Sequence, residues 1–320
     1  MRILSGIQPT GRPHIGNYFG MMEPAIRLQD EGEAFYFIAD YHSLTSLTNA
    51  QELRDNVLHL AIDFLACGLD PAKATFFRQS DVPEVTELTW ILSTLTPIPM
   101  LDNCHSYKDK TARGLTPNTG LFTYPVLMAA DILIYDSDIV PVGKDQKQHI
   151  EVTRDIAAKL NNTYGEVLKI PKPWIKESTA TVPGLDGQKM SKSYDNYIGL
   201  FEQEKALKKK IMGIKTDSTP VEEPKNPDDS LIVTIYRLVA GADQVTAMEE
   251  DFRRGGLGYG EFKKRLFEAM WEYFAPMRAR RAELEANLDH VRDVLRNGAE
   301  KARGIAQKKM DRVRHATGLR

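Results

Sequence analysis

Cysteine is scarce in this chain of 320 residues. Only Cys67 and Cys104 are present, so the chain alone cannot supply a site with four thiolate ligands. Two thiols fit a reducing cytosol, where a free cysteine usually serves as a small buried apolar residue. We therefore expect a cytoplasmic protein with neither a protein-bound metal ion nor an iron–sulfur cluster.

Long apolar runs and a strong excess of one charge are also lacking. No run of 18 or more apolar residues occurs, which argues against a membrane span, and the apolar start is too short for a signal peptide. A net charge of −2 excludes a molecule that is basic overall. The end differs, because residues 276–320 hold twelve Lys and Arg against six Asp and Glu. This excess is typical of a solvated helix face or of a surface that attracts a polyanion.

Short runs rich in β-forming residues alternate with helical patterns in the first half of the chain. We expect strands at residues 2–5, 35–39, 75–78 and 139–142, and a helix over 51–67. This alternation predicts an α/β fold with a parallel sheet and helices on its faces. Ligands of such sheets bind beyond the carboxyl ends of the strands.

The alternation stops twice. Residues 97–118 carry three prolines and a charged piece, and we interpret them as an insertion between the halves of the sheet. After Tyr194 the pattern becomes helical, with a proline-containing linker over 219–229 and helices expected over 230–240, 262–277 and 287–318. These changes predict an α/β domain over 1–193 and an α-helical domain over 194–320, with the last helix able to pack back on the first domain.

The first segment with chemical potential runs from Gly6 to Asn17. It leaves the first expected strand, turns through prolines and glycines, and enters a helix near Ile15. A helix start offers free N–H groups to phosphate, and His14 and Asn17 should project from one face of its first turn. The P-loop pattern is absent. Taken alone, the segment fits a surface turn as well as a phosphate site.

The second segment is Gly-Gln-Lys-Met-Ser-Lys-Ser at residues 187–193. Lys189 and Lys192 stand three apart beside small hydroxyl residues and a glycine. Lysine places a point charge where negative charge develops, so such a loop suits a pyrophosphate leaving group. On its own, the string also fits a solvated polar loop.

Together these segments resemble the signatures of the class I aminoacyl-tRNA synthetases. The second signature of that family, Lys-Met-Ser-Lys-Ser, is present letter for letter at residues 189–193. The first appears as Pro13-His14-Ile15-Gly16-Asn17, a variant that resembles the tryptophanyl branch. Tyr-Pro-Val-Leu-Met-Ala-Ala-Asp at 124–131 and the block at 138–149 are similar to that branch too. The resemblance is detailed over residues 1–196 and patchier beyond.

The resemblance implies a Rossmann-like catalytic domain over 1–193, a dimer contact through the insertion, and an anticodon-binding domain over 194–320. It implies activation of L-tryptophan with ATP and Mg²⁺ to the adenylate, then transfer to tRNA(Trp) with release of AMP and diphosphate. His14, Asn17, Lys189 and Lys192 would be catalytic. Lys144 departs from the acid that close relatives carry there. The implied ATP-binding residues are Gln8, Pro9, Thr10, Gly16, Asn17, Gly143, Lys144, Asp145, Val182, Lys189, Met190, Ser191, Lys192 and Ser193.

The amino acid depends on the block at 124–131. The tyrosyl family carries glutamine where Met128 stands, and methionine suits packing against a large aromatic ring. A buried carboxylate needs a partner, and the indole N–H is a donor that Asp131 would accept. The implied tryptophan-binding residues are Leu4, His42, Tyr124, Met128, Asp131 and Gln146. Two alternatives stay open: a tyrosyl enzyme, and a synthetase-like protein that binds nucleotide or RNA without charging tRNA.

Overall fold

The computed structural model describes residues 1–104, 118–142, 147–175 and 182–320. Contacts group the chain into two compact units. The sheet unit comprises Met1–Gly11, Ala25–Ser178 and Asn287–Arg320, and the helical unit comprises Arg12–Pro24 and Thr179–Ala286. The functional domains expected over 1–193 and 194–320 stay predictions, because they rest on resemblance and not on contacts.

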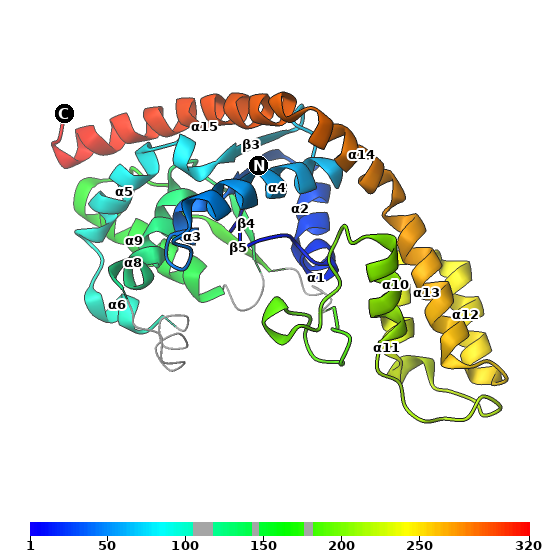
Figure 1. The fold of residues 1–320 in the computed structure, drawn as a ribbon. Helices are drawn as coiled ribbons and strands as arrows, with labels where there is room; N and C mark the ends of the chain where they lie inside the picture. The colour runs from blue at the N-terminus through cyan, green and yellow to red at the C-terminus, as the bar shows by residue number, and fades with distance from the viewer. Residues whose placement is uncertain (105–117, 143–146, 176–181) are drawn as a thin grey trace. The chain divides into compact units, whose positions relative to one another are not determined.

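The sheet unit, drawn with its helices in Figure 1, is built on a parallel sheet. The described strands of that sheet follow the order β3-β2-β1-β4-β5. The four expected strands are confirmed as β1 (Arg2–Ile7), β2 (Glu33–Ile38), β3 (Ala74–Arg78) and β4 (Ile139–Val142). The sequence did not predict β5 (Lys172–Ile175). Pro173 lowers its strand propensity but is tolerated because β5 lies at the end of the strand order, where one side needs no ladder.

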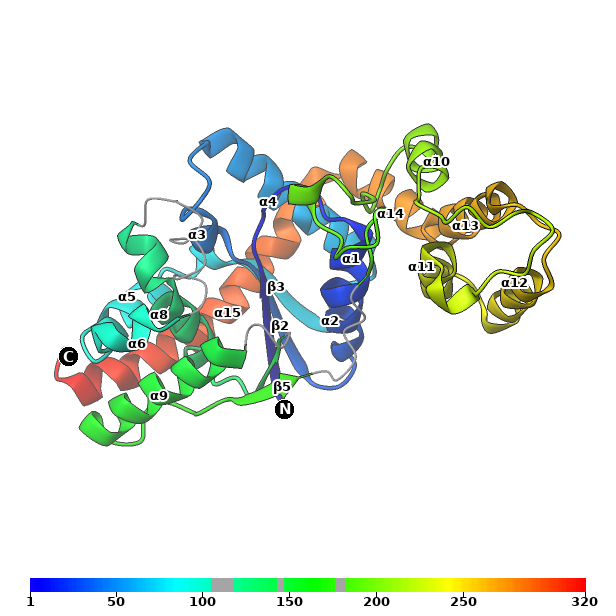
Figure 2. The same ribbon diagram turned by 90° about the horizontal axis from the view of Figure 1, so that it is seen from below.

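Helices cover both faces of this sheet, and Figure 2 shows α8 and α9 on one side and α2 on the other. Phe35, Phe37 and Phe77 pack with α5 (Glu84–Ser93), α8 (Thr119–Leu133) and α9 (Lys147–Tyr164). On the opposite face, Phe76 contacts Phe64 of α4 (Ala50–Ala66), with ring centroids 5.6 Å apart. Burial on both faces explains why the strands are near-continuous apolar runs.

The long C-terminal helix α15 (Leu288–Thr317) packs closely against β3. A Cβ added at Gly298 would lie 1.9 Å from the carbonyl oxygen of Phe76, so a glycine is required where helix and strand backbones meet. Ala299, Ala302 and Ala306 continue the buried face of the helix. The bounds confirm the helix expected over 287–318, which begins after the cap Asn287 and ends at Gly318.

Cations of α15 pair with acids of the sheet unit. Arg303 Nε lies 2.8 Å from Glu84 Oε1, and Arg314 Nη2 lies 2.5 Å from Glu87 Oε2. Buried Lys309 pairs with Asp136. Part of the basic excess at the end of the chain therefore anchors the helix instead of facing a polyanion.

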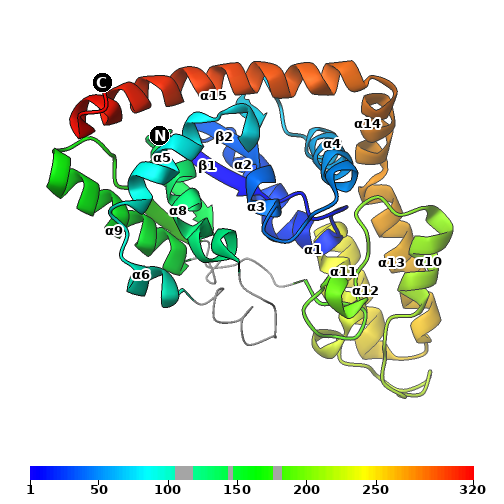
Figure 3. The ribbon, with the colours of Figure 1, turned by 60° about the vertical axis from the view of Figure 1, so that its left-hand side comes forward.

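The helical unit contains α10 (Glu204–Met212), α11 (Leu231–Val239), α12 (Ala242–Arg254), α13 (Tyr259–Tyr273) and α14 (Ala275–Ala286) (Figure 3). The expectation of one helix over 262–277 was wrong, because α13 ends at Tyr273 with Phe274 as its C-cap, and α14 begins at Ala275. Pro276 has no N–H to continue α13 but is tolerated in the first turn of a new helix. Phe262, Leu266 and Met270 are buried at spacings of four residues, so they form an apolar stripe along α13. No described helix is long and apolar enough to cross a membrane.

Candidate active site

The first signature begins a helix in the helical unit. Helix α1 starts at Ile15 as expected, followed by a π-helical segment, η1 (Tyr18–Met22), and α2 (Glu23–Leu28). His14 and Asn17 cap it reciprocally: the Asn17 N–H donates to His14 Nδ1 (3.2 Å), and the His14 N–H donates to Asn17 Oδ1 (3.0 Å). Since Nδ1 accepts, the proton of a neutral His14 ring resides on Nε2.

The charge state of His14 follows from its surroundings. Burial and, to a smaller degree, the positive charge of Lys192 lower the pKa of His14 to about 4. The ring also lies 6.1 Å from the ring of Tyr197. At neutral pH, His14 is therefore an uncharged imidazole with one donor, Nε2–H, free of the helix cap.

The second signature lies in a loop that returns on itself. The Met190 N–H donates to the Val182 carbonyl (3.1 Å), and Pro183 and Lys189 form a β-bridge. The Ser193 N–H donates to the Ser191 hydroxyl (3.2 Å), which begins the short helix η4 (Lys192–Tyr194). Met190 is buried, whereas Lys189, Lys192 and Ser193 are exposed. Desolvation lowers the pKa of Lys192 from its ordinary value.

Asn196 holds this loop together, although sequence reasoning missed it. Its Oδ1 accepts the Ser191 N–H (2.8 Å), and its Nδ2 donates to Asp186 Oδ1 (2.8 Å) and to the Lys189 carbonyl (3.2 Å). The side chain is buried. An asparagine three residues after the signature gives no pattern of its own, so contacts are needed to find it.

The structure brings the two signatures together inside the helical unit. The Ile15 N–H donates to the Ile198 carbonyl (3.0 Å), and the Leu200 N–H donates to the Pro13 carbonyl (3.0 Å). A Cβ at Gly16 would lie 2.9 Å from the His14 ring and 3.4 Å from Met190 Cβ, which explains the glycine. We call His14, Asn17, Lys189, Lys192 and Asn196 the signature cluster. One neutral donor beside two lysines suits a polyphosphate.

A second polar group lies buried in the sheet unit, and we call His42, Gln79 and Asp131 the carboxylate cluster. His42 Nε2 donates to Asp131 Oδ2 (2.8 Å), and Gln79 Nε2 lies 2.8 Å from Oδ1 and 2.9 Å from Oδ2. Asp131 is 2% exposed. Burial raises the pKa of Asp131, and the hydrogen bonds from His42 and Gln79 oppose that rise.

Gln79 is the residue of this cluster that the sequence did not suggest. It directly follows β3 and is 1% exposed. The Tyr41 N–H donates to its Oε1 (3.1 Å). A polar residue at the carboxyl end of an expected strand is a usable signal, because ligands of parallel sheets bind there.

The other residues predicted to bind tryptophan lie around this cluster. Tyr124, Met128 and Asp131 share one face of α8, since they are four and three residues apart. The ring of His42 meets that of Tyr124 edge to face at 6.2 Å. The Tyr124 hydroxyl forms a hydrogen bond with His149 Nε2 on α9. Leu4 of β1 is buried in the core against which Met128 packs.

Several predicted ATP-binding residues lie in the segment after β1 or outside the described residues. Gln8 and Thr10 are exposed after β1, with the Thr10 N–H donating to the Gln8 carbonyl (2.9 Å), and Pro9 between them is buried. The structure does not bring these three residues into contact with the carboxylate cluster through any described hydrogen bond. Gly143, Lys144, Asp145 and Gln146 lie outside the described residues.

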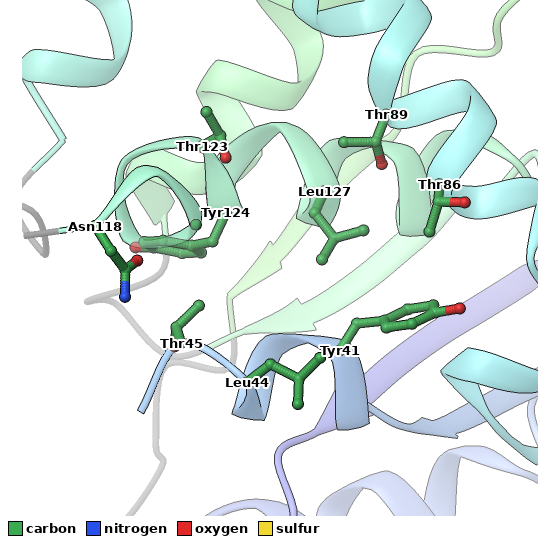
Figure 4. Close-up of a pocket in the computed structure, with 10 residues that line it drawn as sticks. Tyr41, Leu44, Thr45, Thr86, Thr89, Asn118, Thr123, Tyr124 and Leu127 are labelled. Carbon is green, nitrogen blue, oxygen red and sulfur yellow. The ribbon is translucent and has the colours of Figure 1, made fainter. Parts of the chain in front are cut away.

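A cavity of about 460 Å³ opens beside α3 (Asp40–Ser43), α5 and α8 (Figure 4). Tyr41 and Leu44 line it from one side and Leu127 from the other. Among the described residues predicted to bind tryptophan, only Tyr124 lines it. The cavity borders the carboxylate cluster through Tyr41, whose backbone N–H bonds Gln79.

Comparison with known proteins agrees with this geometry. The family described as tRNA synthetases class I (W and Y) matches residues 1–275. A tryptophan–tRNA ligase of Fusobacterium nucleatum is 57% identical over 99% of this chain and 98% of its own length. One from Rhodopirellula baltica is 56% identical over the full length of both. The crystal structure of tryptophanyl-tRNA synthetase from Campylobacter jejuni, complexed with ADP and tryptophan, is 48% identical with a TM-score of 0.95, covering 99% and 100% of the two chains. The chain therefore belongs to the class I tRNA synthetase family for tryptophan and tyrosine.

Proposed function

We infer that the chain is an ATP-dependent tryptophan–tRNA ligase. It activates L-tryptophan with ATP to tryptophanyl-adenylate and transfers the tryptophanyl group to tRNA(Trp), releasing diphosphate and AMP. The observation that carries this inference is the closeness of the two class I signatures, since Met190 Cβ lies 3.4 Å from where a Cβ at Gly16 would be, in a chain that matches tryptophan–tRNA ligases over nearly their full length.

In the first step, a carboxylate oxygen of tryptophan attacks the α-phosphorus of ATP. The bond from that phosphorus to the bridging oxygen breaks, and diphosphate leaves with the electron pair. The nucleophile is already an anion, so no general base is needed, and the rate depends on positioning and charge stabilisation. We assign Lys189 and Lys192 to the developing charge of diphosphate, and His14 Nε2–H and the Asn17 amide to phosphate oxygens. Mg²⁺ enters bound to ATP as part of the substrate.

In the second step, a hydroxyl of the terminal ribose of tRNA attacks the carbonyl carbon of the adenylate, and AMP leaves. We propose that residues 1–193 form the catalytic domain and that residues 194–320 read the anticodon. Unpaired anticodon bases are recognised by stacking and by hydrogen bonds to their edges.

The remaining ATP contacts are proposed on the resemblance. They lie in the segment that follows β1, in the segment that follows β4 and in the loop that carries the second signature. Gly16 lets the backbone lie close to the His14 ring, and Val182 is buried against that loop. The residues are Gln8, Pro9, Thr10, Gly16, Asn17, Gly143, Lys144, Asp145, Val182, Lys189, Met190, Ser191, Lys192 and Ser193.

We propose that Asp131 accepts the indole N–H, with Leu4, His42, Tyr124, Met128 and Gln146 around the ring and amino group. Met128 favours tryptophan over tyrosine, because the tyrosyl family carries glutamine at this place. A synthetase-like protein that does not charge tRNA is disfavoured, since both signatures are intact and in contact.

We also propose that the enzyme is a homodimer through the face that includes the insertion. The large apolar side chains exposed among the described residues include Trp90 (73%), Ile98 (70%) and Leu44 (56%). Such side chains mark an interface where they gather into one contiguous patch. Light scattering should give the mass of a dimer for the wild type and of a monomer for Trp90→Glu. A cytoplasmic location follows from the reaction, because the tRNA pool is there.

Aminoacylation of total tRNA with each amino acid, followed by sequencing of the charged species, tests the function. We expect charging with tryptophan alone and recovery of tRNA(Trp). Charging with tyrosine, or a complete absence of charging by folded protein, would reject the proposal.

A further inference from the structure

The two oxygens of Asp131 are not equivalent. Oδ2 accepts from both His42 Nε2 and Gln79 Nε2, whereas within the described part of the chain Oδ1 has a contact from Gln79 Nε2 only. A carboxylate oxygen can accept two hydrogen bonds. Oδ1 is therefore the oxygen with room for a further donor.

The orientation of the Gln79 amide follows from its other contact. The Tyr41 N–H is a backbone donor, so the Gln79 atom that faces it at 3.1 Å must be the carbonyl oxygen. The amide NH₂ must then face Asp131. Asp40 links the start of α3 to the turn that follows β3. Its Oδ1 accepts the N–H groups of Tyr41 (3.1 Å) and Ser80 (3.0 Å).

Two nitrogen donors point at one buried carboxyl group. This arrangement fits the ionised form of the group, which can accept hydrogen bonds but cannot donate one. Without the Gln79 donor, less would oppose the effect of burial, and Asp131 would take up a proton more readily. A protonated acid can present an O–H to the ligand, and a ligand N–H facing it would be left unpaired. His42 and Gln79, the buried neighbours that face Asp131, would therefore help to select a ligand that carries a hydrogen-bond donor.

We propose that Gln79 is a positioning residue that determines amino-acid specificity: it holds Asp131 as an ionised acceptor and leaves Oδ1 for the indole N–H. This inference rests on the assignment of Asp131 to the indole under the proposed function. Gln79 itself need not touch the substrate, because it acts through Asp131.

The test compares tryptophan with β-(benzothiophen-3-yl)alanine, which has sulfur in place of the indole N–H. Its readout is the ratio of kcat/KM for the two amino acids in ATP–pyrophosphate exchange. We expect the wild type to prefer tryptophan by about 10²-fold or more, because a site built for a donor rejects a ligand that lacks one. Gln79→Glu keeps an acceptor for the Tyr41 N–H but offers no amide donor to Asp131, and Gln79→Met removes both contacts. Both variants should lower the preference at least about tenfold, with little change in the KM for ATP.

Ser80→Ala is the matched control, because Ser80 lies in the same turn but bonds Asp40 instead of Asp131. It should keep the wild-type preference. Thermal denaturation should show that both Gln79 variants are folded. If these folded variants lose activity equally toward the two amino acids, the preference is unchanged and the inference is overturned. A wild type that does not distinguish the two amino acids would instead reject the assignment of Asp131 to the indole.

Discussion

The carboxylate cluster and the signature cluster are built in opposite ways. In the first, the buried side chains of His42 on α3 and Gln79 at the end of β3 both bond buried Asp131 on α8. In the second, backbone bonds and one buried asparagine hold a loop that leaves Lys189 and Lys192 exposed. Under the proposed function, recognition would depend on groups fixed in a core, whereas the chemistry would depend on charges carried by a surface loop.

The physical reason for this difference is the cost of burying charge. A carboxylate in a protein core is tolerated only with donors on its oxygens, so the carboxylate cluster has to be complete before any ligand arrives. A lysine on an exposed loop keeps part of its hydration until a phosphate replaces the water, although Lys192 is already partly desolvated. Variants of the two clusters should therefore affect different kinetic constants.

The largest effect is expected from Lys192→Ala. Loss of a charge that meets developing diphosphate should slow adenylate formation by about 10²–10³-fold. The dissociation constant for tryptophan should change less than about twofold, because the carboxylate cluster is untouched. Single-turnover kinetics and calorimetry measure the two quantities. Lys209→Ala, which removes an exposed lysine of α10, is the control, and near-normal rates for Lys192→Ala would remove it from the chemistry.

Asp131→Asn should act on recognition. The new NH₂ group can face the donors of His42 or Gln79, and an unpaired buried donor costs about 1–3 kcal/mol. The affinity for tryptophan should fall about 10–100-fold, and the KM for ATP should stay near the wild-type value. An unchanged tryptophan affinity by calorimetry would exclude Asp131 from the pocket.

Asn196→Ala should disturb the loop of the signature cluster without removing a cation. Three hydrogen bonds to Ser191, Asp186 and Lys189 are lost. We expect kcat for pyrophosphate exchange to fall about tenfold, at unchanged tryptophan affinity, because the lysines are less well positioned. Asn196→Asp keeps the acceptor for the Ser191 N–H and should be milder. Equal losses in both variants would argue that the donor side alone matters.

The smallest effect concerns stability and pH. Unfolded His14 takes up a proton below its ordinary pKa of 6.5, whereas folded His14 does so only near 4. Acidification through this window favours the unfolded state, so stability falls as pH falls. His14→Asn keeps a capping oxygen but cannot titrate. Between pH 7 and pH 5, the melting temperature of this variant should fall by a few degrees less than that of the wild type. Parallel plots of melting temperature against pH for the two proteins would contradict the burial assigned to His14.

Much of this comparison was predictable from sequence, and the exceptions have physical causes. His14, Lys192, Met128 and Asp131 could be proposed as site residues from the sequence, because motif and spacing are local properties. Gln79 could not, because its proposed role arises from contacts with residues remote in the chain. The break between α13 and α14 was overlooked because the apolar stripe continues through Phe274 while Pro276 interrupts the backbone.

The α/β fold itself follows from the alternation of buried strands and helices, which is confirmed for four strands. The sequence missed β5, because a proline in a four-residue strand leaves almost no periodic pattern. The roles of Gly143, Lys144, Asp145 and Gln146 stay predictions, since these residues lie outside the described part of the chain.

ATP–pyrophosphate exchange with the twenty amino acids, one at a time, shows which amino acid the chain converts to an adenylate. Exchange requires the signature cluster to perform the chemistry and the carboxylate cluster to select the amino acid, without any contribution from tRNA. We expect exchange with tryptophan and only background with tyrosine and phenylalanine. Exchange with tyrosine in the absence of exchange with tryptophan would contradict it.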